Sequence, residues 1–154
     1  MDKIIGLLQN NMGFSLKGLV IFLLPMLPNI FFFILPKPNS SLAVTNNHYL
    51  LDMIEHGSQA IFFVLLIFGV STKESPVLCG YTILMAILLL SYYGLWLAYY
   101  TVGTNFTMIM LMAIFPVSYF FLAEIWLHNL LAIVPLTIFG IAHIIITYIN
   151  YSPH

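Results

Sequence analysis

Residues 130–150 read LLAIVPLTIFGIAHIIITYIN and contain no Lys, Arg, Asp or Glu. An α-helix rises about 1.5 Å per residue, so roughly 20 apolar residues are needed to cross the hydrocarbon of a bilayer. This stretch is long enough to cross a membrane once as a helix, and we expect it to do so.

Four more apolar stretches of similar length precede it, separated by short segments with turn-forming and polar residues. The sequence therefore predicts an all-α, polytopic integral membrane bundle that forms a single domain over residues 1–154. Before the first span, the apolar residues between Ile4 and Met12 predict a short N-terminal amphipathic segment at the interface. The five expected transmembrane helices cover about 18–36, 49–71, 77–101, 106–125 and 130–150.

The composition of the whole chain favours a lipid environment. Of its 154 residues, 62% are hydrophobic and 6% are charged, and the mean hydropathy is +1.04. A soluble domain usually has about 25% charged residues, because water must solvate its surface. We therefore expect the lipid bilayer to be the main partner. Lys17 precedes an apolar run longer than the core of a signal peptide, so the first run is expected to be a permanent span.

Charge and cysteine content argue against several classes of function. The net charge is −1 and the four lysines are widely separated, whereas nucleic-acid binding needs clustered cations. Cys79 is the single cysteine, so an internal disulfide and a cysteine-based zinc site are not expected. HExxH, GxSxG and glycine-rich phosphate motifs are absent from the sequence. We expect no cofactor, no metal ion and no nucleic-acid partner.

The lysines also suggest an orientation in the membrane. With five spans, Lys3, Lys17 and Lys73 lie on one side and only Lys37 lies on the other. Because cytoplasmic segments carry an excess of Lys and Arg, the N-terminus is expected inside and the C-terminus outside. The cell membrane is the expected location.

A stripe of polar residues at the start of the second predicted span is the most informative feature for function. At 100° per residue these side chains fall in a sector about 100° wide, which is one face of a helix. Ionised groups inside a bilayer are costly unless they face protein or water, so the deeper members should face a cavity. A second interpretation is that the span projects beyond the membrane and the stripe is solvated. The stripe consists of His48, Asp52, Glu55, His56 and Gln59, and within it Asp52 and His56, at i and i+4, could pair.

Other polar and aromatic side chains are predicted at the same depth as this stripe. Asn29 lies in the first span, Tyr92 and Trp96 in the third, and His143 in the fifth. The tyrosines and Trp96 could instead form an aromatic belt, and His143 a bond between helices. We expect an outward-facing polar and aromatic pocket made by spans one, two, three and five. Its candidate ligand-binding residues are Asn29, Asp52, Glu55, His56, Gln59, Tyr92, Trp96 and His143.

Three hypotheses of function follow from this pocket. The first is a small protein that binds or transports a small, lipophilic molecule, with a proton link through Glu55 or His56. The second is an intramembrane enzyme that uses Glu55 and His56 as acid and base. The third is a structural or accessory subunit whose polar stripe binds a partner membrane protein or a second copy of the chain.

Overall fold

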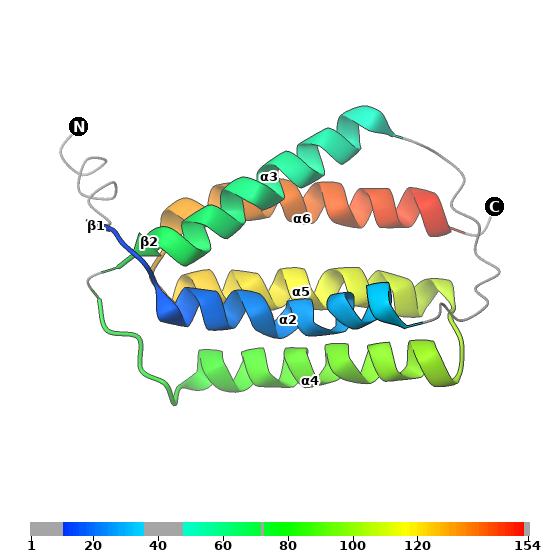
Figure 1. The fold of residues 1–154 in the computed structure, drawn as a ribbon, viewed down its shortest axis with the longest axis horizontal. Coiled ribbons are helices and arrows are strands. Elements are labelled where there is room, and N and C mark those ends of the chain that lie inside the picture. Colours follow the sequence, from blue (N-terminus) through cyan, green and yellow to red (C-terminus); the bar gives the residue numbers. More distant parts are fainter. Residues whose placement is uncertain (1–10, 36–47, 72, 153–154) are drawn as a thin grey trace.

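The computed structural model describes residues 11–35, 48–71 and 73–152, in which five long helices lie side by side (Figure 1). Two short strands, β1 (Asn11–Met12) and β2 (Gly69–Val70), pair antiparallel. The predicted all-α class is confirmed. The helices are α2 (Leu16–Ile34), α3 (Tyr49–Phe68), α4 (Gly80–Thr101), α5 (Phe106–Trp126) and α6 (Leu130–Tyr151).

Four of the described helices, α3 to α6, are long and apolar enough to cross a membrane, and α2 is a shorter apolar helix. Every helix also exposes large apolar side chains, which a soluble protein would bury. The chain is therefore a small multi-pass membrane protein, and a crossing by α2 stays a prediction. Exposed apolar residues from the five helices include Val20, Ile61, Leu90, Ile125 and Val134.

The predicted helix bounds are correct at some ends and wrong at others. The spans predicted at 106–125 and 130–150 match α5 and α6 to within one residue. The first predicted span, 18–36, is shifted: α2 begins at Leu16, because the Ser15 side chain accepts a hydrogen bond from Gly18 N and caps it.

The second and third spans are shorter than predicted. The helix expected over 49–71 ends at Phe68, because Gly69–Val70 leaves it to pair with β1. The helix expected over 77–101 begins only at Gly80, where Cys79 and Thr82 form a reciprocal cap. Most of the predicted amphipathic segment lies outside the described residues, and its end, Asn11–Met12, is strand β1.

The pairing of β1 with β2 also completes the hydrogen bonding at the end of α3. The last carbonyl groups of a helix have no partner within the helix. Gly13 N donates to Phe68 O at 3.0 Å, and Ser15 N donates to Ile67 O at 2.8 Å. The start of α2 is thereby fixed at the end of the bundle where α3 finishes.

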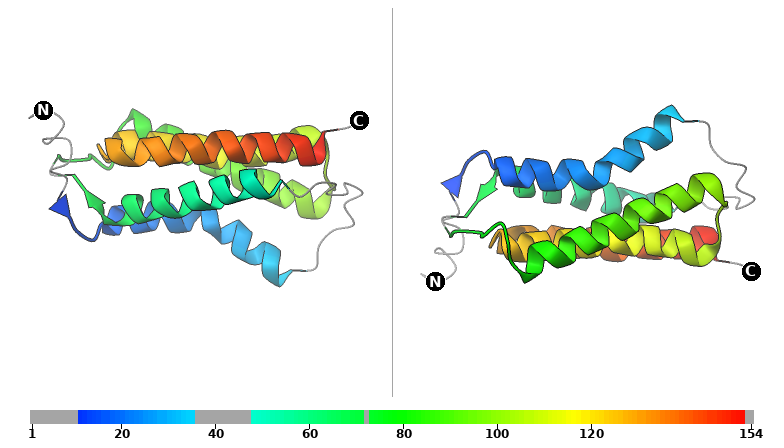
Figure 2. Two further views of the ribbon diagram at one scale, coloured as in Figure 1. Left: turned by 90° about the horizontal axis from the view of Figure 1, so that it is seen from above. Right: turned by 90° about the horizontal axis from the view of Figure 1, so that it is seen from below.

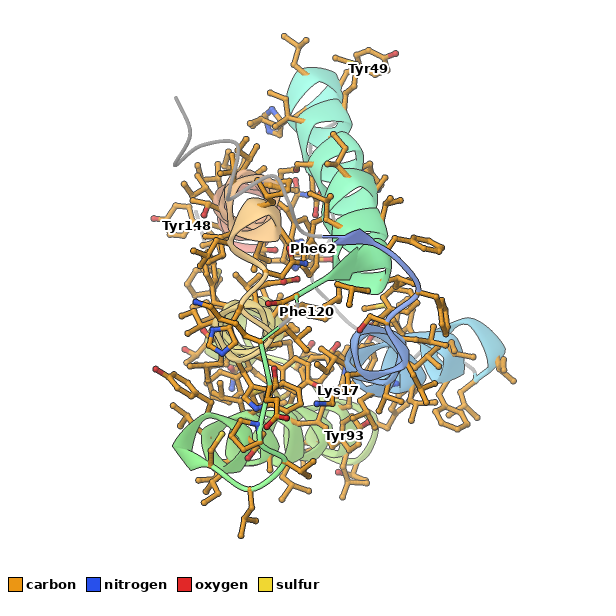
Figure 3. All side chains as sticks on the ribbon, turned by 90° about the vertical axis from the view of Figure 1, so that its left-hand side faces the viewer. Lys17, Tyr49, Phe62, Tyr93, Phe120 and Tyr148 are labelled. Atoms are coloured by element: carbon orange, nitrogen blue, oxygen red, sulfur yellow. The ribbon has the colours of Figure 1, made fainter. Side chains whose placement is uncertain are left out.

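The helices surround a common interior. In order around the bundle, α2 packs on α3, α3 on α6, α6 on α5, α5 on α4 and α4 on α2. Figure 3 looks along this bundle and shows Phe62 and Phe120 between the helices. Both rings are almost fully buried, and their centroids lie 5.0 Å apart in an edge-to-face arrangement. Figure 2 shows that the second half of α2, beyond Pro25 and Pro28, bends away from the other helices.

Candidate functional site

The side chains of Glu55 of α3 and His143 of α6 form a hydrogen bond inside the bundle. The Glu55 Oε1 atom lies 2.5 Å from His143 Nδ1, and the two side chains are 14% and 31% exposed. The His143 ring also stacks on Phe139, with centroids 5.3 Å apart. Because Nδ1 is occupied by the carboxylate, Nε2 is the ring nitrogen left for another partner.

The polar stripe of α3 divides between two directions. Gln59 follows Glu55 by one turn and lines a cavity inside the bundle. His56 turns outward with 74% of its side chain exposed, and its Nδ1 atom lies 2.7 Å from the main-chain oxygen of Asp52. His56 thus contacts the Asp52 main chain, whereas the sequence suggested a side-chain pair. Asp52 and His56 do not line that cavity, and neither does His48 just before the helix.

The cavity has a volume of about 240 Å³ and lies in the half of the bundle nearer the end of α6. We call it the five-helix cavity, because each of the five helices contributes to its lining. The polar and ionisable side chains of the lining come from four helices, and apolar and aromatic groups complete it. The lining residues are Met26, Asn29, Gln59, Phe63, Tyr92, Trp96, Ile109, Met112, Ala113, Pro116, Val117, Phe120, Phe139, His143, Thr147 and Tyr151.

Five of the eight residues chosen from sequence therefore line one cavity: Asn29, Gln59, Tyr92, Trp96 and His143. Glu55 stands directly behind His143. The contribution of α5 was missed, because its lining residues are apolar and give no signal that separates them from residues facing lipid.

Tyr92 and Asn29 join α4 to α2 at the wall of the cavity. The Tyr92 hydroxyl donates to Asn29 Oδ1 at 3.3 Å. One residue further along α4, the Tyr93 hydroxyl donates to Leu24 O at 2.6 Å. Leu24 O needs this partner, because the residue four positions later is Pro28, which has no N–H to donate. The proline breaks one helical hydrogen bond, and a tyrosine on the neighbouring helix replaces it.

Trp96 is the centre of an aromatic cluster at the same level. Its indole lies edge-on to Phe32 and Tyr99, with centroids 5.6 and 5.5 Å away, and stacks on Tyr100 at 6.1 Å. Its Nε1 atom is buried and has no hydrogen-bond partner among the described residues. The Trp96 side chain also contributes to the lining of the five-helix cavity.

The opposite end of the bundle carries a separate polar cluster. Glu124 is fully buried, and neither carboxylate oxygen has a hydrogen-bond partner in the described part of the chain. Asn129 lies beside it and donates from Nδ2 to Leu65 O at 2.9 Å. Lys17 donates to Ser75 O at 3.0 Å, and its ammonium lies 5.3 Å from the Trp126 ring centroid.

Over the described ranges 11–35, 48–71 and 73–152, no three His, Cys, Asp or Glu side chains lie close enough to hold a metal ion. The Glu55–His143 pair can hold or transfer a proton, and the amide and hydroxyl groups of the cavity can donate and accept hydrogen bonds. The arrangement therefore suits recognition of a small molecule with a polar group and an apolar body.

Comparison with known proteins gave no match to a protein-family model, to a curated protein or to a solved structure.

Proposed function

We propose that this protein binds or transports a small, lipophilic molecule in the five-helix cavity. The observation that carries the proposal is the convergence of polar groups from four helices on a cavity that is otherwise apolar and aromatic. Small-molecule sites in proteins have this composition. The volume of about 240 Å³ is below the range of about 300–1,000 Å³ common for such sites, so the part of the ligand held there is small.

The proposal includes five membrane crossings with the N-terminus inside. Strand β1 holds the start of α2 at the same end as the end of α3, so α2 runs along the bundle in the opposite direction to α3. Its 19 residues give a length of about 28 Å, close to the thickness of the hydrocarbon. The cavity then opens toward the outer side of the cell membrane.

The contact between Glu55 and His143 gives the site a route to proton coupling. A ligand that hydrogen-bonds to His143 Nε2 contacts the same imidazole that meets the Glu55 carboxylate, so ligand binding and proton transfer can be linked there. The geometry favours Glu55 with His143 over His56 for this role, because the His56 ring faces outward.

The test combines ligand identification with substitution. Small molecules that remain bound after gentle purification are identified by native mass spectrometry, and uptake of the identified compound is then measured in proteoliposomes. Glu55→Gln is expected to remove the pH dependence of uptake, and His143→Leu to reduce binding at least tenfold. The matched control is His56→Leu, which changes an exposed imidazole on α3 that lies outside the cavity. Equal effects of His143→Leu and His56→Leu would contradict the proposal.

An intramembrane enzyme is the second candidate, and the short Glu55–His143 contact is the observation that favours it. A carboxylate that orients a histidine is a common acid–base arrangement in catalysis. The two candidates differ in one respect. An enzyme converts the identified compound in detergent, without a gradient, and Glu55→Gln stops that conversion, whereas a transporter or binding protein leaves the compound unchanged.

A further inference from the structure

A second hollow lies between α2 and α4 on the outer surface of the bundle. Its volume is about 320 Å³. Several of its residues are well exposed, including Phe31 at 55% and Leu97 at 67%, so it faces the surroundings of the bundle. We call it the α2–α4 groove. It is lined by Leu27, Pro28, Phe31, Leu35, Tyr93, Trp96, Leu97 and Tyr100.

Trp96 lines both the α2–α4 groove and the five-helix cavity. The Trp96 side chain is therefore part of the wall between the two spaces. This wall includes the edge-to-face contact of Trp96 with Phe32, at 5.6 Å between centroids, and the 3.3 Å hydrogen bond between Tyr92 and Asn29. A rotation of the indole, with a small shift of α2, would join the two spaces.

The structure of α2 lowers the free-energy cost of such a shift. Pro25 and Pro28 each remove a main-chain hydrogen bond, and the helix bends away from the bundle beyond them (Figure 2). The bond from Tyr93 to Leu24 O holds α2 to α4 on the near side of the bend. Beyond the bend, side chains alone make the contact, through the bond of Tyr92 with Asn29 and the rings of Phe32 and Trp96.

We propose that the ligand is a neutral single-chain amphiphile, with its polar head in the five-helix cavity and its hydrocarbon chain in the α2–α4 groove. This inference rests on the proposed function and narrows its ligand class. The groove is apolar and faces the lipid, so a chain from the bilayer is its occupant. The head is neutral because no Lys, Arg, Asp or Glu lines the cavity, and His143 is already hydrogen-bonded to Glu55.

The position of Trp96 supplies a fluorescent reporter. The chain has two tryptophans, so Trp126→Phe leaves Trp96 as the only one. The probe is monoolein brominated across its double bond, added to phosphatidylcholine vesicles that contain this variant. We expect Trp96 fluorescence to be quenched saturably at low mole fraction and restored by excess unbrominated monoolein. In the converse variant, Trp96→Phe, the remaining Trp126 at the other end of the bundle should show no saturable quenching.

Filling the groove tests where the chain lies. Leu97→Phe is expected to raise the half-quenching mole fraction at least tenfold. Leu90→Phe is the matched control, since Leu90 is on the same helix, is 69% exposed and lies outside the groove. Quenching proportional to mole fraction, as for bulk lipid, or equal effects of the two variants, would overturn the inference. Saturable quenching that Gln59→Leu leaves unchanged would also overturn it, because the head would then lie outside the cavity.

Failure of this inference can be told from failure of the proposed function. If mass spectrometry identifies a compound whose binding depends on His143 while Trp96 shows no saturable quenching, that result would support the proposed function and contradict the role of the α2–α4 groove. Absence of both the His143-dependent binding and the saturable quenching of Trp96 would contradict both the proposed function and this inference.

Discussion

Glu124 is the residue whose surroundings are the least favourable for its charge. It is fully buried, and both carboxylate oxygens lack a hydrogen-bond partner among the described residues. The nearest polar side chain is Asn129, whose Nδ2 atom donates to Leu65 O and whose Oδ1 atom is also unpaired. An ionised group without a partner in an apolar interior lowers stability, unless it is neutralised.

We expect Glu124→Gln to raise the free energy of unfolding by about 1 kcal/mol, because the new amide can donate a hydrogen bond to the unpaired Asn129 Oδ1. The measurement is unfolding in mixed detergent micelles followed by tryptophan fluorescence. Glu74→Gln is the control, since Glu74 is exposed and its neutralisation should have little effect. A clear loss of stability in Glu124→Gln would show that the carboxylate has an essential partner.

The Glu55–His143 pair should behave in the opposite way, because each group satisfies the other. Glu55→Leu and His143→Leu are each expected to lower the free energy of unfolding by about 1–3 kcal/mol, since each leaves one polar group unpaired. The double variant should lose about 1–2 kcal/mol less than the sum of the two, as the coupling energy of a polar pair between membrane helices. Additive losses would mean that the two side chains do not interact.

At the scale of single residues, the sequence predicted which polar residues face the interior better than it predicted their hydrogen-bond partners. The periodicity of α3 placed Glu55 and Gln59 on one face, and both turn toward the interior. The partner of Glu55 is 88 residues away, and local periodicity carries no information about such a distance. Glu124 and Asn129 are polar residues at and after the end of the fourth predicted span, yet both are buried, because the turn between α5 and α6 folds against the end of α3.

At the scale of whole helices, two of the close contacts that hold α2 can be tested by substitution. The first is at Gly18. A Cβ atom at this position would lie 2.0 Å from Leu66 O of α3, too close for any real side chain. Glycine therefore allows the backbones of α2 and α3 to cross in contact.

We expect Gly18→Ala to lower the free energy of unfolding by about 2 kcal/mol or more, because the main chain of α3 must move. The matched control is Gly94→Ala on α4, where an added Cβ meets nothing within 4 Å. That change should be neutral or stabilise by up to about 1 kcal/mol, since alanine favours a helix over glycine. Detergent unfolding measures both, and equal effects would contradict the close crossing.

The second contact is the bond from Tyr93 to Leu24 O, and it should depend on Pro28. Tyr93→Phe is expected to cost about 1 kcal/mol, because Leu24 O loses its partner. In a Pro28→Ala background the same change should cost much less, since the new N–H at position 28 can donate to that oxygen. A double-mutant cycle on the four proteins measures the difference. An identical cost in both backgrounds would show that the tyrosine does not replace the missing bond.

Helix ends were the least predictable part of the elements. The apolar run from Phe62 continues through Val70, and the single glycine at position 69 is a weak signal that α3 ends at Phe68. The helix ends there because Gly69–Val70 pairs with Asn11–Met12, a contact between distant segments. Local caps were recognised in one case: the predicted start after Asn105 was correct, whereas the caps at Ser15 and Cys79 set the starts of α2 and α4 at other positions than predicted.

At the scale of the whole molecule, the bundle has two different ends. Lys17, Lys73 and Trp126 lie at the end where α3 finishes, and Lys17 and Trp126 donate there to main-chain oxygens of Ser75 and Pro76. The other end carries the turn at Gly103 and the end of α6, and the five-helix cavity lies in that half. If the lysine-rich end faces the cytoplasm, as the excess of lysines there predicts, the half with the cavity faces the outer side.

Labelling with a membrane-impermeant maleimide tests this orientation and the crossing of α2 together. Native Cys79 is a built-in reporter for the lysine-rich end. The main-chain N–H of Thr82 donates to its thiol and lowers the pKa of Cys79, so the reactive thiolate is favoured.

In intact cells we expect Cys79 to react only after permeabilisation. In a Cys79→Ser background, Thr104→Cys should react from outside. Phe14→Cys should be protected like Cys79, because β1 places it at the same end as β2. Reaction of Phe14→Cys from outside, with Cys79 protected, would mean that α2 does not cross the membrane. Reaction of Cys79 from outside, with Thr104→Cys protected, would mean that the cavity opens to the cytoplasm.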